Sequence, residues 1–189
     1  MYEIMSSDEA IRLIRDGDCI CVKFVCGNRE SGGTSRGPYR RYQRMRSPSH
    51  LTMISSAGFG LWDENRNAEG YIREGAVDRL ICGHFGAMLS TKKLVMEDRF
   101  EAYNLPLGVF PMPSGHRQAG CLVLFPRWGL IFSWIPEGKA AGINRLSVDD
   151  SLDKYGGGRW EEFLYYKLPK ITVALNKGDS GRPKGKYFF

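Results

Sequence analysis

The stretch that decides the fold runs from residue 69 to residue 108. It contains Glu69-Gly70-Tyr71-Ile72-Arg73-Glu74-Gly75, then Arg79-Leu80-Ile81-Cys82-Gly83-His84-Phe85-Gly86, then Leu94-Val95-Met96-Glu97, and it closes with Glu101-Ala102-Tyr103-Asn104-Leu105-Pro106-Leu107-Gly108. Short apolar runs end in Gly-His-x-Gly and Asn-x-Pro-x-Gly, with a helical segment between them. In an open α/β sheet, turns at the carboxyl ends of strands are where ligands bind. The stretch therefore predicts two strands whose turns belong to a binding site.

Further strands and helices follow from the apolar pattern of the whole chain. Apolar runs at 19–25, 51–55, 79–82, 101–104 and 171–175 predict five neighbouring strands of one sheet, covered on both faces. Helices are expected after the Ser6-x-x-Glu9 capping box, ended by Gly17 in the left-handed conformation, and at 68–75 and 92–99. Residues 162–167 predict another strand, and Gly156-Gly157-Gly158 before it is interpreted as a flexible loop. Alternating strands and helices favour a three-layer α/β/α fold with a mostly parallel sheet.

Composition places the chain among ordinary globular proteins. Its 189 residues are 42% hydrophobic and 25% charged, which predicts a single domain with a core of its own. No apolar run approaches the roughly 18 residues that a membrane helix requires, and the N-terminus lacks the layout of a signal peptide. A cytoplasmic location without membrane contact is therefore expected. The net charge of +6 favours anionic partners such as coenzyme A or nucleic acid.

The cysteines and histidines do not predict a metal site. The five cysteines are odd in number, and most lie in apolar runs, as buried free thiols do. There is no CxxC pair, and only three histidines are available, His50, His84 and His116.

Two windows, 28–46 and 111–141, follow no packing period and are expected to be the least ordered and least buried parts of the chain. The first contains the basic cluster Arg36, Arg40, Arg41, Arg44 and Arg46, interleaved with Tyr39 and Tyr42. Arginines with aromatics are how single-stranded nucleic acid is held. A solvated basic loop is the simpler interpretation, and a basic RNA-binding module that uses this cluster is the alternative function.

The motifs, taken in order, resemble the amino-terminal half of acyl-CoA transferases of the acetate/propionate/3-oxoacid type. The similarity includes the helix-Gly-Asp-strand opening around Gly17-Asp18, residues 57–108, and residues 160–175 with their continuation to Phe188. Each motif alone is weak, and the Gly-His-x-Gly and Asn-x-Pro-x-Gly turns alone are also compatible with plain structural turns. The ordered series favours the CoA-transferase fold. A sugar-phosphate isomerase with the same general fold has no supporting motif.

The resemblance implies transfer of coenzyme A between short-chain carboxylic acids, as in ketone body or short-chain fatty acid metabolism. In that family a glutamate attacks the acyl thioester, an anhydride and then a glutamyl-CoA thioester form, and backbone N–H groups at glycine-rich turns stabilise the oxyanion. The acyl-CoA thioester is a substrate, and no bound cofactor is implied. By resemblance, the residues that face substrate or coenzyme A are Gly27, Asn28, Gly83, His84, Tyr103, Asn104, Pro106 and Gly108.

The resemblance also implies that this chain is an incomplete α-like domain, inactive alone. The nucleophilic glutamate belongs to the carboxyl-terminal half of the family's chains, and no residue here is assigned as catalytic: Glu69, Glu74, Glu97 and Glu101 do not match its motif. A β half or subunit that carries the nucleophile is the implied partner. The family usually has glutamine where Leu107 stands, and the first glycine-rich loop is replaced by residues 27–33.

The two unusual windows suggest a hypothesis of out-of-frame translation. Residues 133–137, back-translated and read one frame over, can encode Val-Asp-Pro-Arg, and the family has an Asp-Pro-Arg segment at this point. Residues 31–38 in the other shifted frame can give Pro-Glu-Glu-Leu-Leu, which fits an expected helix. The nucleotide sequence decides the hypothesis, since its shifted frames must restore these motifs.

Overall fold

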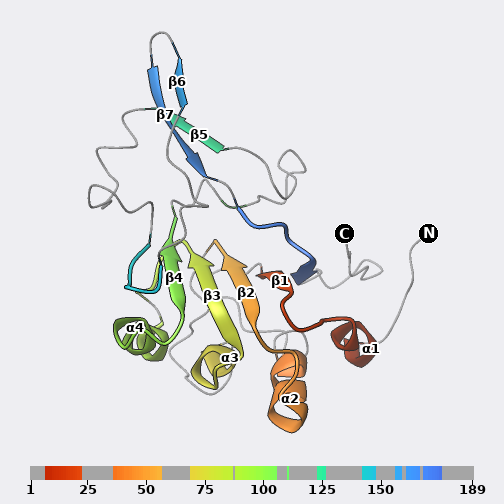
Figure 1. Cartoon of the computed structure of the whole chain (residues 1–189). Coiled ribbons are helices and arrows are strands. Elements are labelled where there is room, and N and C mark those ends of the chain that lie inside the picture. The colour runs from red at the N-terminus through yellow and green to blue at the C-terminus, as the bar shows by residue number, and fades with distance from the viewer. Residues whose placement is uncertain are drawn as a thin grey trace, which may run out of the picture.

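A parallel sheet of five strands forms the centre of the computed structural model, which describes residues 7–22, 36–56, 69–86, 88–105, 110, 123–126, 142–147, 156–158, 161–166 and 168–175. The strands are β1 (Cys19–Val22), β2 (Leu51–Ser55), β3 (Val77–Cys82), β4 (Glu101–Asn104) and β8 (Val173–Leu175). They lie in the order β4-β3-β2-β1-β8, and every pairing is parallel (Figure 1). The prediction that these five runs are strands of one sheet is confirmed, and with it the α/β class.

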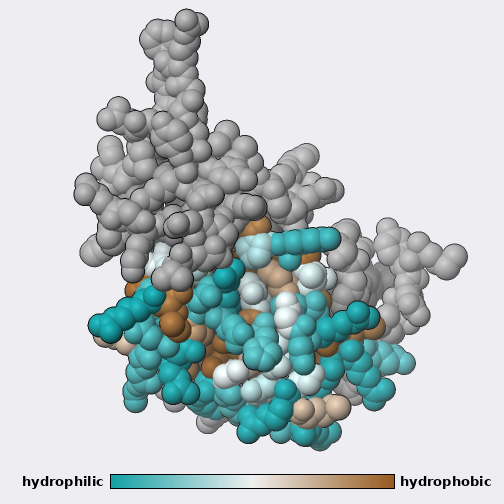
Figure 2. All heavy atoms as spheres, viewed as in Figure 1, coloured by the Kyte–Doolittle hydropathy of each residue, from teal (hydrophilic) through white to brown (hydrophobic). Residues whose placement is uncertain are grey.

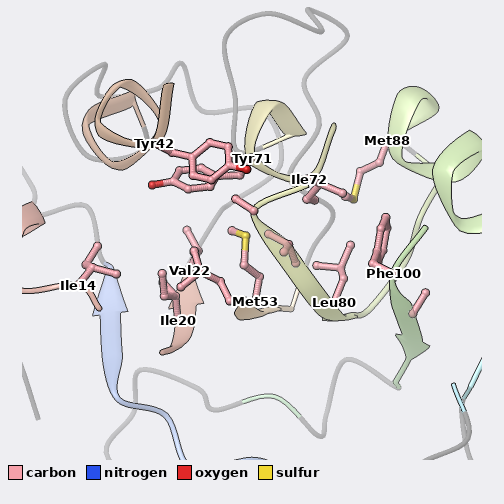
Figure 3. Close-up of a cluster of buried hydrophobic side chains, with 14 of the residues drawn as sticks. Ile14, Ile20, Val22, Tyr42, Met53, Tyr71, Ile72, Leu80, Met88 and Phe100 are labelled. Carbon is pink, nitrogen blue, oxygen red and sulfur yellow. The ribbon is translucent and has the colours of Figure 1, made fainter. Parts of the chain in front are cut away.

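The described helices are α1 (Ser7–Arg12), α2 (Arg36–Met45), α3 (Glu69–Arg73) and α4 (Leu89–Met96). Side chains of α2, α3 and the start of α4 meet those of the strands on one face of the sheet, where they form the main hydrophobic cluster (Figure 3). The second helical layer, expected on the opposite face of the sheet, stays a prediction. None of the described helices is long and apolar enough to span a bilayer.

The sheet is buried on both faces, as continuous apolar strands require. Ile20, Met53 and Leu80 lie side by side in register and face the helices. The next residue along each strand points to the other face, where Ile54 and Ile81 are at most 1% exposed. The register extends this second row from Ala174 through Cys21, Ile54 and Ile81 to Tyr103.

A second, antiparallel sheet contains β5 (Val123–Pro126), β6 (Gly156–Gly158) and β7 (Glu161–Tyr166), in the order β5-β7-β6. In Figure 1 it lies beyond the carboxyl ends of β2, β3 and β4. β7 confirms the strand predicted at 162–167. The interpretation of 156–158 as a loop was wrong, because these glycines form strand β6, which pairs with β7. The two strands are close enough in sequence to form an antiparallel hairpin.

The first helix is shorter than its apolar stripe suggested. It ends at Arg12, and Leu13, expected on the buried stripe, is 50% exposed. Gly17 has the expected left-handed conformation, with φ of 80°, but it lies in the turn before β1 and not at the helix end. The carbonyls of Ile11 and Ile14 are instead satisfied by the Arg41 guanidinium, at 2.8 and 2.9 Å.

The largest correction concerns α2, which occupies the second half of the window expected to be disordered. Pro38 lies in its first turn, where a missing N–H costs no helical hydrogen bond. Tyr42 is 5% exposed and belongs to the main cluster, and Tyr39 packs against that cluster. Both rings lie within 6 Å of the Tyr71 ring of α3, at 5.9 Å for Tyr39 and 5.8 Å for Tyr42. The expectation that this window is among the least buried parts of the chain is therefore wrong for both tyrosines.

Polar contacts fix α2 to the end of α3. The Tyr39 hydroxyl donates to Glu74 Oε1 at 2.6 Å, and Gln43 Nε2 donates to the same oxygen at 3.3 Å. The Tyr42 hydroxyl donates to the Glu74 carbonyl at 3.1 Å, and Arg46 lies 3.8 Å from Glu74 Oε2. The hydrogen bond from Tyr39 is the main cause that holds the pKa of Glu74 below its usual value.

This packing contradicts the hypothesis that residues 36–46 are read out of frame. A segment that was not selected to fold is not expected to bring two tyrosines, a glutamine and an arginine into contact with Glu74, which directly follows another helix. Within the window 111–141, only β5 is described, and the other residues of that window, including the apolar run at 130–135, lie outside the described residues. The frame hypothesis is kept only for parts that the structure does not describe.

A double-mutant cycle tests the fit between α2 and α3. A Cβ added at Gly70 would lie 2.6 Å from Cζ of Tyr39, whose ring is held in place by the hydrogen bond to Glu74. We expect Gly70→Ala to destabilise the protein by about 1–3 kcal/mol in urea unfolding, as overpacking does. In a Tyr39→Ala background the same change should be neutral or stabilise by up to about 1 kcal/mol, because alanine is the better helix former. Equal effects in both backgrounds would show that the contact does not exist.

Candidate functional site

The turns that follow β3 and β4 lie next to each other at the carboxyl end of the sheet. Cys82 and Asn104, the last residues of these strands, are paired, and the Leu105 N–H donates to the Cys82 carbonyl at 3.0 Å. The two glycine-containing motifs that decided the sequence interpretation are therefore brought together. Parallel pairing is the cause, since it aligns the carboxyl ends of adjacent strands.

The Gly83 N–H already has a partner in this arrangement. It donates to the Ser55 carbonyl at 3.2 Å and so continues the hydrogen bonding between β2 and β3. The expected role of this turn as an oxyanion donor cannot use that N–H in this conformation. Any donor at this turn has to come from another group.

A groove of about 980 Å³ opens beside these turns. It is lined, among the described residues, by turn residues, by one side of α4 and by a segment near residue 144: His84, Phe85, Lys92, Val95, Met96, Asp98, Asn104, Ile143, Asn144 and Arg145. This volume is at the upper end of the range of ligand sites, about 300–1,000 Å³. The groove thus has the size of a site for a small molecule.

One wall of the groove is a face of α4. Lys92, Val95 and Met96 stand three and four residues apart, which places them on the same side of the helix. Val95 is buried, whereas Met96 is 78% exposed. In the space-filling view, hydrophobic surface is visible among hydrophilic residues on the side of the molecule where α4 lies (Figure 2).

Another part of the lining is the segment 142–147, which is anchored by buried polar side chains. Asn144 Nδ2 donates to the Phe100 carbonyl at 2.7 Å and lies 3.4 Å from the Val95 carbonyl. Ser147 Oγ accepts the Ala102 N–H at 3.0 Å and lies 2.6 Å from Asn144 Oδ1. The Ile143 N–H donates to the Ala102 carbonyl at 2.9 Å. These contacts tie the segment to β4 and to the end of α4.

Asp98 joins the two walls. Its φ of 53° is in the left-handed region, which ends α4. Non-glycine residues adopt this conformation infrequently, and aspartate is among those that tolerate it best. The Asp98 carboxylate accepts a hydrogen bond from the Arg145 N–H at 3.0 Å. This contact with a distant part of the chain helps to hold Asp98 in the left-handed conformation. The Arg145 backbone is thereby tied to the residue that follows the end of α4.

The structure places some of the predicted substrate-facing residues at the groove and another on the opposite face of the sheet. His84 and Asn104 both line the groove, and Gly83 is in the turn beside them. Tyr103 points to the other face of the sheet, where it is 1% exposed and is not among the groove residues. Gly27, Asn28, Pro106 and Gly108 lie outside the described residues. The sequence analysis did not predict the groove residues Ile143, Asn144 and Arg145. The only local pattern that could have indicated them is Asn144-x-x-Ser147, which is typical of a turn.

Tyr103 has a structural environment of its own. Arg79 Nε lies 2.6 Å from Glu101 Oε2, and the Tyr103 hydroxyl donates to the same oxygen at 3.2 Å. The Arg79 guanidinium lies 5.8 Å from the centre of the Tyr103 ring. If Tyr103 contacts substrate, it therefore does so on the face of the sheet opposite α4.

The described cysteines are unreactive thiols. Cys19 and Cys82 are buried, Cys21 is half-buried, and all three are free. Burial raises the pKa of Cys19 and of Cys82 to about 12, and it also raises the pKa of Cys21. Among the described residues, no group of three or more histidine, cysteine or acidic side chains is placed to hold a metal ion.

Comparison with known proteins identifies the class of protein to which this fold corresponds. An acyl-CoA transferase from Escherichia coli O157:H7, YdiF, solved as apoenzyme, superposes with a TM-score of 0.73 over 92% of this chain and 33% of its own, at 24% identity. The same enzyme as a thioester complex with CoA gives a TM-score of 0.69, also at 24% identity, over 92% of this chain and 34% of its own. The fold is that of acyl-CoA transferases.

A sequence relative points the same way. Caffeate CoA-transferase from Acetobacterium woodii is 25% identical over 193 aligned residues, which cover 100% of this chain and 36% of that protein. A scan against protein-family models finds no match. The resemblance to acyl-CoA transferases is confirmed, and the chain spans about a third of the length of the proteins it matches.

The anchoring of the segment 142–147 is open to a direct test. A Cβ added at Gly142 would lie 2.7 Å from Cβ of Ser147 and 2.8 Å from its backbone oxygen, so Gly142→Ala should displace the segment. We expect a loss of about 1–3 kcal/mol in unfolding free energy. Gly86→Ala is the matched control, since a Cβ there meets nothing within 4 Å and should change stability by less than about 0.5 kcal/mol. A Gly142→Ala variant as stable as the control would contradict the anchoring.

Proposed function

We propose that this chain is the amino-terminal α-like region of an acyl-CoA transferase that moves coenzyme A between carboxylic acids. The observation that carries the proposal is the groove at the carboxyl ends of β3 and β4, lined by His84 and Asn104, in a fold shared with acyl-CoA transferases. The sequence relationship to a caffeate CoA-transferase supports the same reaction class. The acyl-CoA and the carboxylic acid are its substrates.

In this proposal the turns bind and position the acyl group and the adjoining part of coenzyme A. The residues assigned to this task are His84 and Asn104 in the groove, with Gly83, Tyr103, Gly27, Asn28, Pro106 and Gly108 kept as predicted contacts. Asn104 is exposed and lines the groove. Short-chain acids and a cytoplasmic setting remain the expectations for the whole enzyme.

The nucleophile is proposed to come from a β half or subunit. Glu74 is held by Tyr39 and Gln43, and Glu101 by Arg79 and Tyr103. Glu97 caps the carboxyl end of α4 and lies 3.9 Å from Lys93. None of these three carboxylates lines the groove among its described residues, so none is placed to attack a thioester bound there.

The alternative RNA-binding function lacks support from the cluster on which it was based. The Tyr39 and Tyr42 rings pack against Tyr71 and the main cluster, so they are not available to stack on bases. Arg41 binds the carbonyls that end α1, and Arg46 lies 5.5 Å above the Tyr42 ring. Arg41 and Arg46 therefore have structural partners within the protein.

The proposed division of roles predicts the outcome of a trapping experiment. Incubation of the purified chain with acetyl-CoA and propionate, followed by borohydride reduction, should leave no modified glutamate on this chain, and transfer should be absent. Adding a β region that carries the glutamate nucleophile should raise the rate by several orders of magnitude, as expected for restoring a covalent nucleophile. Peptide mass spectrometry and the rate of propionyl-CoA formation are the readouts.

Two results would overturn the proposal. An adduct on Glu69, Glu74, Glu97 or Glu101 of the chain alone would make one of these the nucleophile. No transfer from the folded, reconstituted pair would remove the assignment as a CoA-transferase. Glu97→Gln is the matched control for a non-specific adduct, because the Glu97 side chain is 47% exposed and does not line the groove.

A further inference from the structure

The groove along α4 combines apolar walls with unbalanced positive charge. Met96 is 78% exposed and Ile143 is 48% exposed, and both line it together with Phe85. Large side chains of this kind are seldom left exposed together without a function. Their arrangement in a recess, not on a flat surface, favours a small ligand with an apolar part.

The charged groups of the groove favour an anion. Lys92 from α4 and Arg145 from the segment 142–147 are both exposed, and His84 also lines the groove. Asp98 is the acidic residue among the described lining, and its carboxylate is already engaged by the Arg145 N–H. An arginine and a lysine that line the same groove are suited to binding one carboxylate.

We propose that this groove binds an amphipathic carboxylate, with the anionic head between Lys92 and Arg145 and the apolar tail against Met96 and Ile143. The groove is larger than a short-chain acid needs, so the preferred acid carries a medium-length alkyl chain or an aromatic ring. The inference rests on the proposed function only for the assignment of this acid as a substrate of transfer.

The test uses the full chain with methionines labelled at the methyl carbon and observes them by NMR. Octanoate, added below its micelle concentration, should shift the Met96 resonance and leave Met45 unchanged. Met45 is the matched probe, since it is 68% exposed on α2 and lies outside the groove. Acetate should bind at least about tenfold more weakly, because it lacks the apolar tail.

Charge variants locate the head group. Lys92→Gln and Arg145→Gln should each weaken octanoate binding about tenfold, as expected for loss of a charge-assisted contact. Arg145→Gln keeps the backbone N–H that Asp98 accepts, so the wall remains in place. Lys93→Gln is the matched control, since it removes the same charge from the neighbouring position, where Lys93 pairs with Glu97 outside the groove.

Three outcomes would overturn the inference: equal shifts of Met96 and Met45, equal losses for Lys92→Gln and Lys93→Gln, or no response of Met96 at millimolar octanoate. Because this binding needs no coenzyme A and no turnover, its failure is distinct from failure of the transfer assay. Octanoate binding with the expected variant pattern, together with absent transfer in the reconstituted pair, would keep the site and remove only its place in the proposed reaction.

Discussion

The parallel register of β3 with β4 is the constraint on which the rest of the site depends. It places Cys82 beside Asn104, so two turns separated by a helix in the sequence end at the same edge of the sheet. The connection between these strands has to cross back over the sheet, and α4 is that connection. Consequently the same pairing that aligns the turns also places the Lys92–Met96 face of α4 beside them. A shift by one residue would turn Asn104 toward the opposite face.

The central sheet was predictable because its signal is local. Each of the five strands is a short apolar run bounded by turn residues, and burial on both faces requires little more information than that. The turns containing His84 and Asn104 were predictable for the same reason. The position of Tyr103 relative to the groove was not, since alternation tells which residues share a face but not which face meets a ligand.

Features that depend on a distant partner were missed. The window around α2 is rich in arginine and has few apolar residues, so no helix was predicted from it. Tyr39 and Tyr42 nevertheless stand three residues apart, which places them on one side of a helix. What stabilises this helix is Tyr71, Gly70 and Glu74, which lie about thirty residues further along the chain. The groove wall around Asn144 is a similar case, because its hydrogen-bond partners are carbonyls of residues 95 and 100. The triple glycine strand likewise depends on β7 and not on its own composition.

The way the segment 142–147 contacts β4 has a consequence for the limits of the sheet. Among the described strands β4 is the last on its side, and the outward N–H and C=O of an edge strand are a template for pairing with another chain. Here the Ala102 carbonyl is taken by the Ile143 N–H, and the Ala102 N–H by the Ser147 hydroxyl. A hydroxyl group satisfies the donor as a carbonyl would, but it belongs to a side chain and so begins no further strand. While Ser147 is in place, this edge of the sheet does not offer Ala102 as a starting point for aggregation.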